Sequence, residues 1–168
     1  MSVEIRQYIG SHDEEIAAMI LEIQTQEFEV AISREDQPDL SDIRTFYQRG
    51  AGNFWIAYGD GQVVGTTALI DMGNGQGAIR KMFVRKEWRG SQHHVASKLM
   101  SELIRWAQRH GIREIFLGTI PVYAAARRFY EKQGFTVLPK SALPLSFPLM
   151  KVDTLFYHQK LEPTASSG

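Results

Sequence analysis

The chain has 168 residues, and its 19 basic side chains balance its 19 acidic ones, so its formal net charge is zero at neutral pH. A balanced charge provides no general cationic field for nucleic acid or for an anionic membrane. The absence of cysteine excludes disulfides, thiolate metal sites and a cysteine nucleophile. No run of about 18 apolar residues and no signal-peptide pattern occurs, so we expect a cytoplasmic protein without a membrane segment.

This length suits a single domain with an apolar core, which we assign to residues 1–163, and the small polar residues 164–168 are expected to form a disordered tail. The domain should begin with a strand over residues 3–9. A helix with an acidic first turn is expected next, and Ser11 is its predicted N-cap.

Residues 33–42 are polar and predict a loop, and residues 40–49 predict a short helix that ends at Gly50. Two glycine-rich turns then separate alternating apolar segments, which indicates three antiparallel strands. These strands are expected over residues 54–58, 63–70 and 78–84.

From Val95, apolar residues recur at helical intervals until Gly111 ends the predicted helix. A short strand over 114–119, a helix over 123–133 and a final strand over 152–161 follow. The expected order of the whole chain is β-α-α-β-β-β-α-β-α-β-β, including one more strand between the last helix and the final strand, which is typical of an α/β domain.

The segment WRGSQHHVASKLM, residues 88–100, changes from a small-residue loop into this helix. Backbone N–H groups at a helix N-terminus can bind phosphate, Arg89 adds a permanent positive charge, and Gly90 permits the backbone angles of a loop around an anion. An ordinary turn with a solvated arginine would have the same residues. His93 and His94 cannot share one metal ion, because neighbouring side chains on a helix point about 100° apart, so no metal site is predicted.

Three segments occur in this order along the chain: IRKMFV, the loop and helix from RGSQHH to HGI, and AAARRFYEKQGF after EIFLGT. Together they resemble the GCN5-related N-acetyltransferase (GNAT) family, which moves an acetyl group from acetyl-CoA to an amine. The most specific part is residues 79–135. The resemblance implies an acyl-CoA N-acyltransferase fold, with a mixed, mostly antiparallel sheet of about seven strands and about four helices, splayed in the middle to hold CoA.

In that family, the strand matching Lys81 to Val84 binds the pantetheine arm of CoA along its free edge, as an added strand would bind. The resemblance therefore assigns the cofactor amides to that strand and the pyrophosphate to the loop before the following helix. The implied cofactor residues are Met82, Phe83, Val84, Arg89, Gly90, Ser91, Gln92, His93, His94, Val95, Ala96 and Tyr123. Ser91 stands where the family usually has Gln or Arg, and His94 stands where it usually has Gly.

Tyr130 lies in the AxxFYEKxGF motif and matches the family tyrosine that protonates the departing sulfur, so the resemblance makes it the general acid. The base is left open among Glu27, Glu29, Asp36 and Asp71, each acting through water, and loss of the proton to solvent. Glu27, Glu29 and Asp71 are also the expected contacts of the amine, since acidic side chains attract a cation.

The resemblance implies direct transfer of acetyl from acetyl-CoA to a primary amine, without a metal or a covalent enzyme intermediate. The alternative is a module of the same fold that binds acyl-CoA without catalysis. A nucleic-acid-binding role would rest on the cluster ARRFYEK alone, and the neutral overall charge does not favour it. The expected partners are acetyl-CoA and a small-molecule or peptide amine, with neither nucleic acid nor membrane, and a homodimer is the expected assembly.

Overall fold

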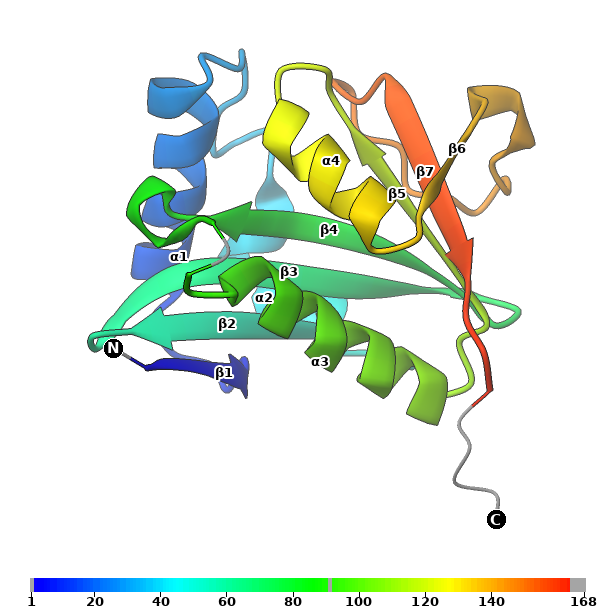
Figure 1. Cartoon of the computed structure of the whole chain (residues 1–168), viewed down its shortest axis with the longest axis horizontal. Coiled ribbons are helices and arrows are strands. Elements are labelled where there is room, and N and C mark those ends of the chain that lie inside the picture. Colours follow the sequence, from blue (N-terminus) through cyan, green and yellow to red (C-terminus); the bar gives the residue numbers. More distant parts are fainter. Residues whose placement is uncertain (1, 91, 164–168) are drawn as a thin grey trace.

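The computed structural model describes residues 2–90 and 92–163 and contains one seven-stranded sheet in the order β1-β2-β3-β4-β5-β7-β6 (Figure 1). Neighbouring strands are antiparallel except β4 and β5, which are parallel. The expected tail, 164–168, lies outside the described residues. The strands are β1 (Val3–Gln7), β2 (Asn53–Gly59), β3 (Gln62–Gly73), β4 (Gln76–Val84), β5 (Glu114–Thr119), β6 (Thr136–Leu138) and β7 (Leu155–Lys160).

Four α-helices and several shorter helical segments connect these strands. They are α1 (Asp13–Leu21), the π-helix η1 (Glu22–Glu27), the 3-10 helix η2 (Pro38–Ser41), α2 (Ile43–Tyr47), η3 (Lys86–Trp88), α3 (Val95–Arg109), α4 (Ala124–Lys132) and η4 (Lys140–Ala142). This arrangement confirms the expected α/β fold with its mixed sheet and the expected order of the elements.

The buried apolar side chains of the described residues form three clusters, and the two larger ones lie on opposite faces of the sheet, because successive side chains of a strand point to opposite faces. On β2, Trp55 and Ala57 belong to the core under α3, where Leu99 is buried. Phe54 and Ile56 belong to the core that includes α1 and α2. In Figure 1, α3 and α4 lie in front of the sheet and α1 lies behind it.

The start of α1 differs from the prediction. Ser11 was the expected N-cap, but the helix begins at Asp13 and His12 occupies the cap position with a left-handed backbone, φ 69°. The reason is a turn in which both Gly10 and His12 have positive φ, so Ser11 lies before the cap. Tyr8 donates a hydrogen bond of 2.6 Å to Asp13, which fixes the first turn instead.

The second helix is shorter than predicted: α2 covers Ile43–Tyr47, whereas residues 40–49 were expected. Asp42 caps α2 by accepting a hydrogen bond of 3.3 Å from the backbone N–H of Thr45. The residues before this cap form η2, a 3-10 turn within the segment predicted to be a loop.

The strands β4 and β5 diverge halfway along β4. They pair only over Gln76–Ile79 of β4 and the first four residues of β5. One extra residue in β4 produces a bulge against β3 at Lys81, which has φ 56°. Thr66 completes the bulge by donating a hydrogen bond of 2.7 Å from its Oγ1 to the carbonyl oxygen of Lys81. Beyond Ile79, therefore, the edge of β4 that faces β5 has no strand partner in the described sheet.

Candidate active site

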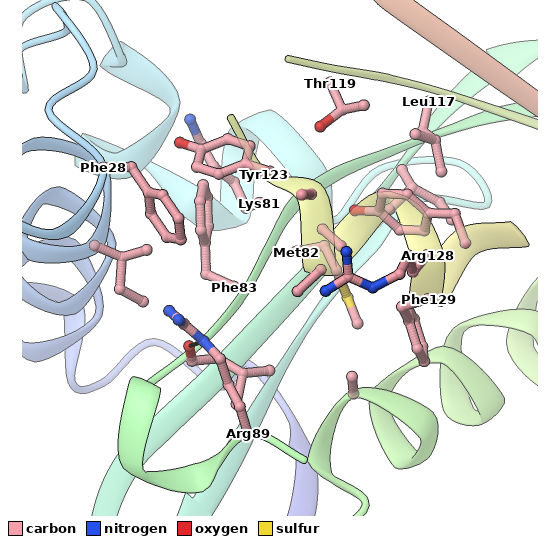
Figure 2. A pocket seen from close by; sticks show the side chains of 18 of the residues that line it. Phe28, Lys81, Met82, Phe83, Arg89, Leu117, Thr119, Tyr123, Arg128 and Phe129 are labelled. Atoms are coloured by element: carbon pink, nitrogen blue, oxygen red, sulfur yellow. Dashed lines mark hydrogen bonds between the residues drawn. The ribbon is translucent and has the colours of Figure 1, made fainter. Parts of the chain in front are cut away.

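A cavity of about 660 Å³ opens where β4 and β5 diverge (Figure 2). Its walls are the second half of β4, the end of β5, the length of α4, the loop before α3 with its first turn, and η1 with the segment that follows it. Met150, Val152 and Asp153, which precede β7, complete the lining. Its volume lies within the range of ligand sites in proteins, about 300–1,000 Å³. The divergence of two strands thus creates a site of ligand size in the middle of the sheet.

The structure brings most of the sequence-predicted cofactor residues to this cavity. Gln92, His93 and Val95 do not line it, and Ser91 lies outside the described residues. The ring of His93 packs at 4.8 Å from Trp88, while Val95 is buried in the core under α3. The predicted residues that line the cavity are Met82, Phe83, Val84, Arg89, Gly90, His94, Ala96, Tyr123 and the predicted acid Tyr130.

His94 is the residue before the first turn of α3, and its backbone is left-handed with φ 55°. Glycine adopts this conformation without strain, which is a physical reason for the glycine that the GNAT pattern usually has there. The side chain of His94 makes no capping hydrogen bond to the helix, so the first-turn N–H groups of α3 remain available to an anion.

Arg89 and Glu27 bind each other, although phosphate had been expected for the first and an amine for the second. Nη2 of Arg89 lies 2.7 Å from Oε1 of Glu27, and Nη1 donates a second bond to Oε2. Nε of Arg89 also donates to the carbonyl oxygen of Val84 at 2.8 Å. The guanidinium lies 5.5 Å from the ring centroid of Phe28, and Figure 2 shows both side chains at the edge of the cavity.

The other acidic candidates lie away from the cavity lining. Asp71 accepts hydrogen bonds of 2.9 Å from the backbone N–H groups of Ala51 and Gly73. Asp36 accepts from the backbone N–H of Ser33 at 3.0 Å, which lowers the pKa of its carboxyl. Glu29 does not line the cavity either. The expectation that Glu29 and Asp71 contact the amine, and that one of these three carboxylates is the base, therefore has no geometric support.

Lys81 brings a buried charge network to the cavity that the sequence did not indicate. Its Nζ lies 2.5 Å from Oε1 of Gln37 and 3.5 Å from Oδ2 of Asp39. Asp39 in turn accepts a hydrogen bond of 2.5 Å from the hydroxyl of Tyr47. Burial lowers the pKa of Lys81 to about 8, and the nearby Asp39 opposes this effect.

Arg80 and Asp153 also line the cavity, and neither was predicted. The guanidinium of Arg80 forms no hydrogen bond or ion pair with any described residue, and Asp153 is the one carboxylate among the described lining residues. Asp153 lies directly against Gly118, since a Cβ at position 118 would be 2.6 Å from its Oδ2. Burial raises the pKa of Asp153 to about 6, against the opposing effect of Arg80 and Lys81.

Two tyrosines come from the α4 region. Tyr130 is buried, with its ring 6.0 Å from Phe135, and its hydroxyl has no hydrogen-bond partner among residues 2–90 and 92–163. Burial, with a smaller effect of Asp153, raises the pKa of Tyr130 far above its ordinary value, so its hydroxyl stays protonated at neutral pH. Tyr123 packs edge-on against Phe28 at 5.0 Å and Phe83 at 6.0 Å, as Figure 2 shows.

Within the described part of the chain, no group of three His, Cys, Asp or Glu side chains is arranged to hold a metal ion. The helices in the same part lack the combination of length and apolar character that crossing a bilayer requires.

A mixed sheet that opens between two parallel strands, with a ligand-sized cavity in the opening, defines the acyl-CoA N-acyltransferase fold. The model of the acetyltransferase (GNAT) family matches residues 17–135. The chain belongs to the GNAT family, a family of acyltransferases, and the resemblance seen in the sequence is confirmed.

Solved structures and curated relatives agree with this assignment. An acetyltransferase of the GNAT family from Staphylococcus aureus is 38% identical, with a TM-score of 0.92 over 96% of this chain and 100% of that one. The N-acetylaspartate synthetase of Xenopus tropicalis is 35% identical over 101 residues, which are 58% of this chain and 36% of that protein. This chain thus spans about a third of the length of such curated relatives.

A more distant structure shares the fold alone. It is the PaiA N-acetyltransferase of Thermoplasma acidophilum in complex with coenzyme A, which is 18% identical with a TM-score of 0.74 over 95% of this chain and 99% of that one.

Proposed function

We propose that this protein transfers an acetyl group from acetyl-CoA to a primary amine by direct attack of the amine. The observation that carries this proposal is the free edge of β4 beyond Ile79. This edge borders a cavity that is also lined by the first turn of α3. Membership of the GNAT family and the names of its relatives, which include an N-acetylaspartate synthetase, support the same reaction.

The residues of the cavity fit acetyl-CoA. The backbone of Met82, Phe83 and Val84 offers hydrogen-bonding groups that an extended pantetheine arm can pair with. The N-terminus of α3 offers backbone N–H groups to the pyrophosphate, and the lining side chains of Arg128 and Lys132 add positive charge. Acetyl-CoA supplies the acetyl group as a thioester.

Asp153 is the proposed proton acceptor for the amine. An alkyl ammonium has a pKa near about 10.4 and must lose a proton before its nitrogen can attack. With a pKa of about 6, Asp153 is ionised at neutral pH and can attract the ammonium and then accept its proton, directly or through water. This carboxylate replaces the acidic candidates that the sequence suggested, because it lines the cavity.

Tyr130 is the proposed proton donor. Its hydroxyl is protonated throughout the neutral range and has no partner among the described residues, so its proton is available to the departing sulfur. The new carbon–nitrogen bond forms as the carbon–sulfur bond breaks. An ammonium and a thioester thereby give an amide, a thiol and one proton released to solvent.

Two measurements test this function. Calorimetric titration with acetyl-CoA should show binding, and thiol release should rise above the rate without amine when the acceptor is added. A module that binds acyl-CoA without catalysis is the second candidate, favoured by Ser91 and His94, which depart from the usual pyrophosphate pattern. Binding with no amine-dependent thiol release across amino acids, polyamines, aminoglycosides and peptides would support that module and refute the proposed function.

A further inference from the structure

We propose that the acceptor is an amino acid or a similar amine with a carboxylate beside its amino group, and that Arg80 binds this carboxylate. The inference rests on the proposed function and specifies its acceptor. It is carried by the charges of the cavity that have no partner among the described residues, Arg80 and Asp153, and by the face of β4 on which Arg80 lies.

The charges near the bulge leave one cation and one anion without partners. Lys81 is satisfied by Gln37 and by Asp39. Arg80 has no ion pair or hydrogen bond from its side chain to any described residue, and the same holds for the carboxylate of Asp153. Although both line the cavity, they do not pair with each other. A ligand with an ammonium and a carboxylate would complement both groups.

Arg80 lies on the face of the sheet opposite α3. Ile79 belongs to the core under α3, so strand alternation directs Arg80 to the other face. The bulge keeps the next residue, Lys81, on that same face, where it reaches Asp39 of η2. The start of α3, the expected pyrophosphate site, lies on the opposite side. Arg80 is therefore positioned to bind the acceptor and is directed away from the phosphates.

The chemistry of this pocket favours a carboxylate over a second cation. A guanidinium binds a carboxylate through two parallel hydrogen bonds, and a half-buried guanidinium without a partner loses hydration without compensation. Polyamines and aminoglycosides would place further ammonium groups beside Arg80 and Lys81, where like charges repel. The same cavity also has apolar lining residues that an acceptor side chain could contact, among them Val30, Ile32, Met150 and Val152.

Matched acceptors test the carboxylate. We would compare leucine with leucinamide and isoamylamine, and repeat the comparison with phenylalanine, its amide and phenethylamine. The amide is less basic than the amino acid and the decarboxylated amine is more basic, so a preference for the amino acid over both cannot arise from basicity. The expected kcat/KM is about 10- to 100-fold higher for the amino acid.

Arg80→Gln should reduce this preference to nearly one by lowering kcat/KM for the amino acid far more than for the other two compounds, with acetyl-CoA affinity retained. Arg109→Gln is the matched control, because Arg109 is exposed at the end of α3 and lies outside the cavity. Equal or better turnover of the compounds without a carboxylate, or an equal loss for all three compounds in Arg80→Gln, would overturn the inference.

Binding without turnover separates this inference from the proposed function. The same compounds are titrated into the protein saturated with CoA, which carries no acetyl group to transfer. Arg80-dependent binding of the amino acids would support the inference even if no amine released thiol, a result that would refute the proposed function alone. If acetyl-CoA releases thiol only when polyamines or aminoglycosides are the acceptors, and amino acids do not bind selectively, the proposed function stands and the inference is refuted.

Discussion

Glu27 at the end of η1 and Arg89 in the loop before α3 form a two-point ion pair between residues that are 62 positions apart in the sequence. The pair joins the segment behind the sheet to the loop that is expected to hold the CoA pyrophosphate. Arg89 also donates to Val84, so its guanidinium is fixed by two elements. A phosphate that binds Arg89 must therefore compete with Glu27.

Glu27→Gln should strengthen CoA binding, because Arg89 then loses a competing carboxylate and gains freedom to bind phosphate. We expect the Kd for CoA to fall about fivefold at low salt, which corresponds to about 1 kcal/mol, and the gain to diminish as salt screens the charges. Calorimetry at several salt concentrations measures this. Glu22→Gln is the control, since Glu22 pairs with Arg85 instead, at 3.5 Å. Unchanged or weaker CoA binding in Glu27→Gln would show that the ion pair does not compete with phosphate.

Tyr130→Phe should lower kcat by about 100-fold or more while the Kd for acetyl-CoA changes little, because it removes a proton donor and leaves the ring in place. Steady-state kinetics and calorimetry measure the two quantities. Tyr157→Phe is a matched control, since the hydroxyl of Tyr157 donates to Glu131 at 3.0 Å and that residue does not line the cavity. An equal loss of turnover and of cofactor affinity would argue against an acid role for Tyr130.

The pH profile should report Asp153. Its carboxyl must be ionised to accept a proton, so kcat/KM should fall as the pH decreases through about 6, the pKa to which burial raises this group. In Asp153→Asn, kcat/KM should be low and this limb should be absent. Asp36→Asn is the control, because Asp36 lies outside the cavity and the limb should persist. A limb with an unchanged midpoint in Asp153→Asn would exclude Asp153 as its origin.

The raised pKa of Asp153 also predicts how the stability of the fold depends on pH. The folded pKa of Asp153, about 6, lies above its ordinary value of 3.8, so the folded state favours the protonated carboxyl. Its contribution is fully present below pH 3.8 and is lost as the pH rises through about 6. Asp153→Asn should therefore be more stable than the unchanged protein at pH 8, by about 1–3 kcal/mol in denaturant unfolding. No gain at pH 8 would contradict the buried ionised carboxylate.

His94→Gly should tighten acetyl-CoA binding, because it removes the imidazole at a position whose backbone is already left-handed. His94→Ala removes the same ring but must keep a Cβ in that conformation, so it should be less stable than His94→Gly by about 1 kcal/mol. Calorimetry and urea unfolding of both variants separate steric bulk from backbone conformation. If neither variant changes the affinity for acetyl-CoA, the imidazole does not obstruct the cofactor.

Local patterns predicted most of the fold. The helix α3 begins at Val95 as predicted, because its apolar spacing and the preceding loop are both local signals. The strands β2, β3 and β4 are also confirmed. They were predictable because glycine-rich turns separate them, and Gly61 and Gly75 in these turns have the positive φ that glycine permits. The Ser11 cap was wrong, because the residue in the cap position depends on a turn at Gly10 that the preference for serine does not reveal.

The candidate site likewise contains residues that local patterns predicted and residues that they did not predict. Met82, Phe83, Val84 and Tyr130 line the cavity, and all lie in segments with a recognisable motif. The contact of Lys81 with Gln37 spans 44 positions, and no local signal connects the two residues. Asp153, which precedes β7, likewise lies against Gly118 of β5, a residue distant from it in the sequence. Long-range pairs of this kind determined which charges meet the cavity, and single-sequence patterns do not contain that information.

The extra residue at Lys81 also reverses the alternation of β4. Before the bulge, even-numbered Arg80 points away from α3; after it, odd-numbered Phe83 packs into the core of α1 and α2, while Met82 and Val84 face the α3 side. One continuous strand thus presents different side chains to its two faces, from which the amine and the cofactor are proposed to approach. In the proposed reaction, the bulge therefore determines the face from which each substrate reaches the reacting carbonyl, and loop movement would alter access to the site without changing these directions of approach.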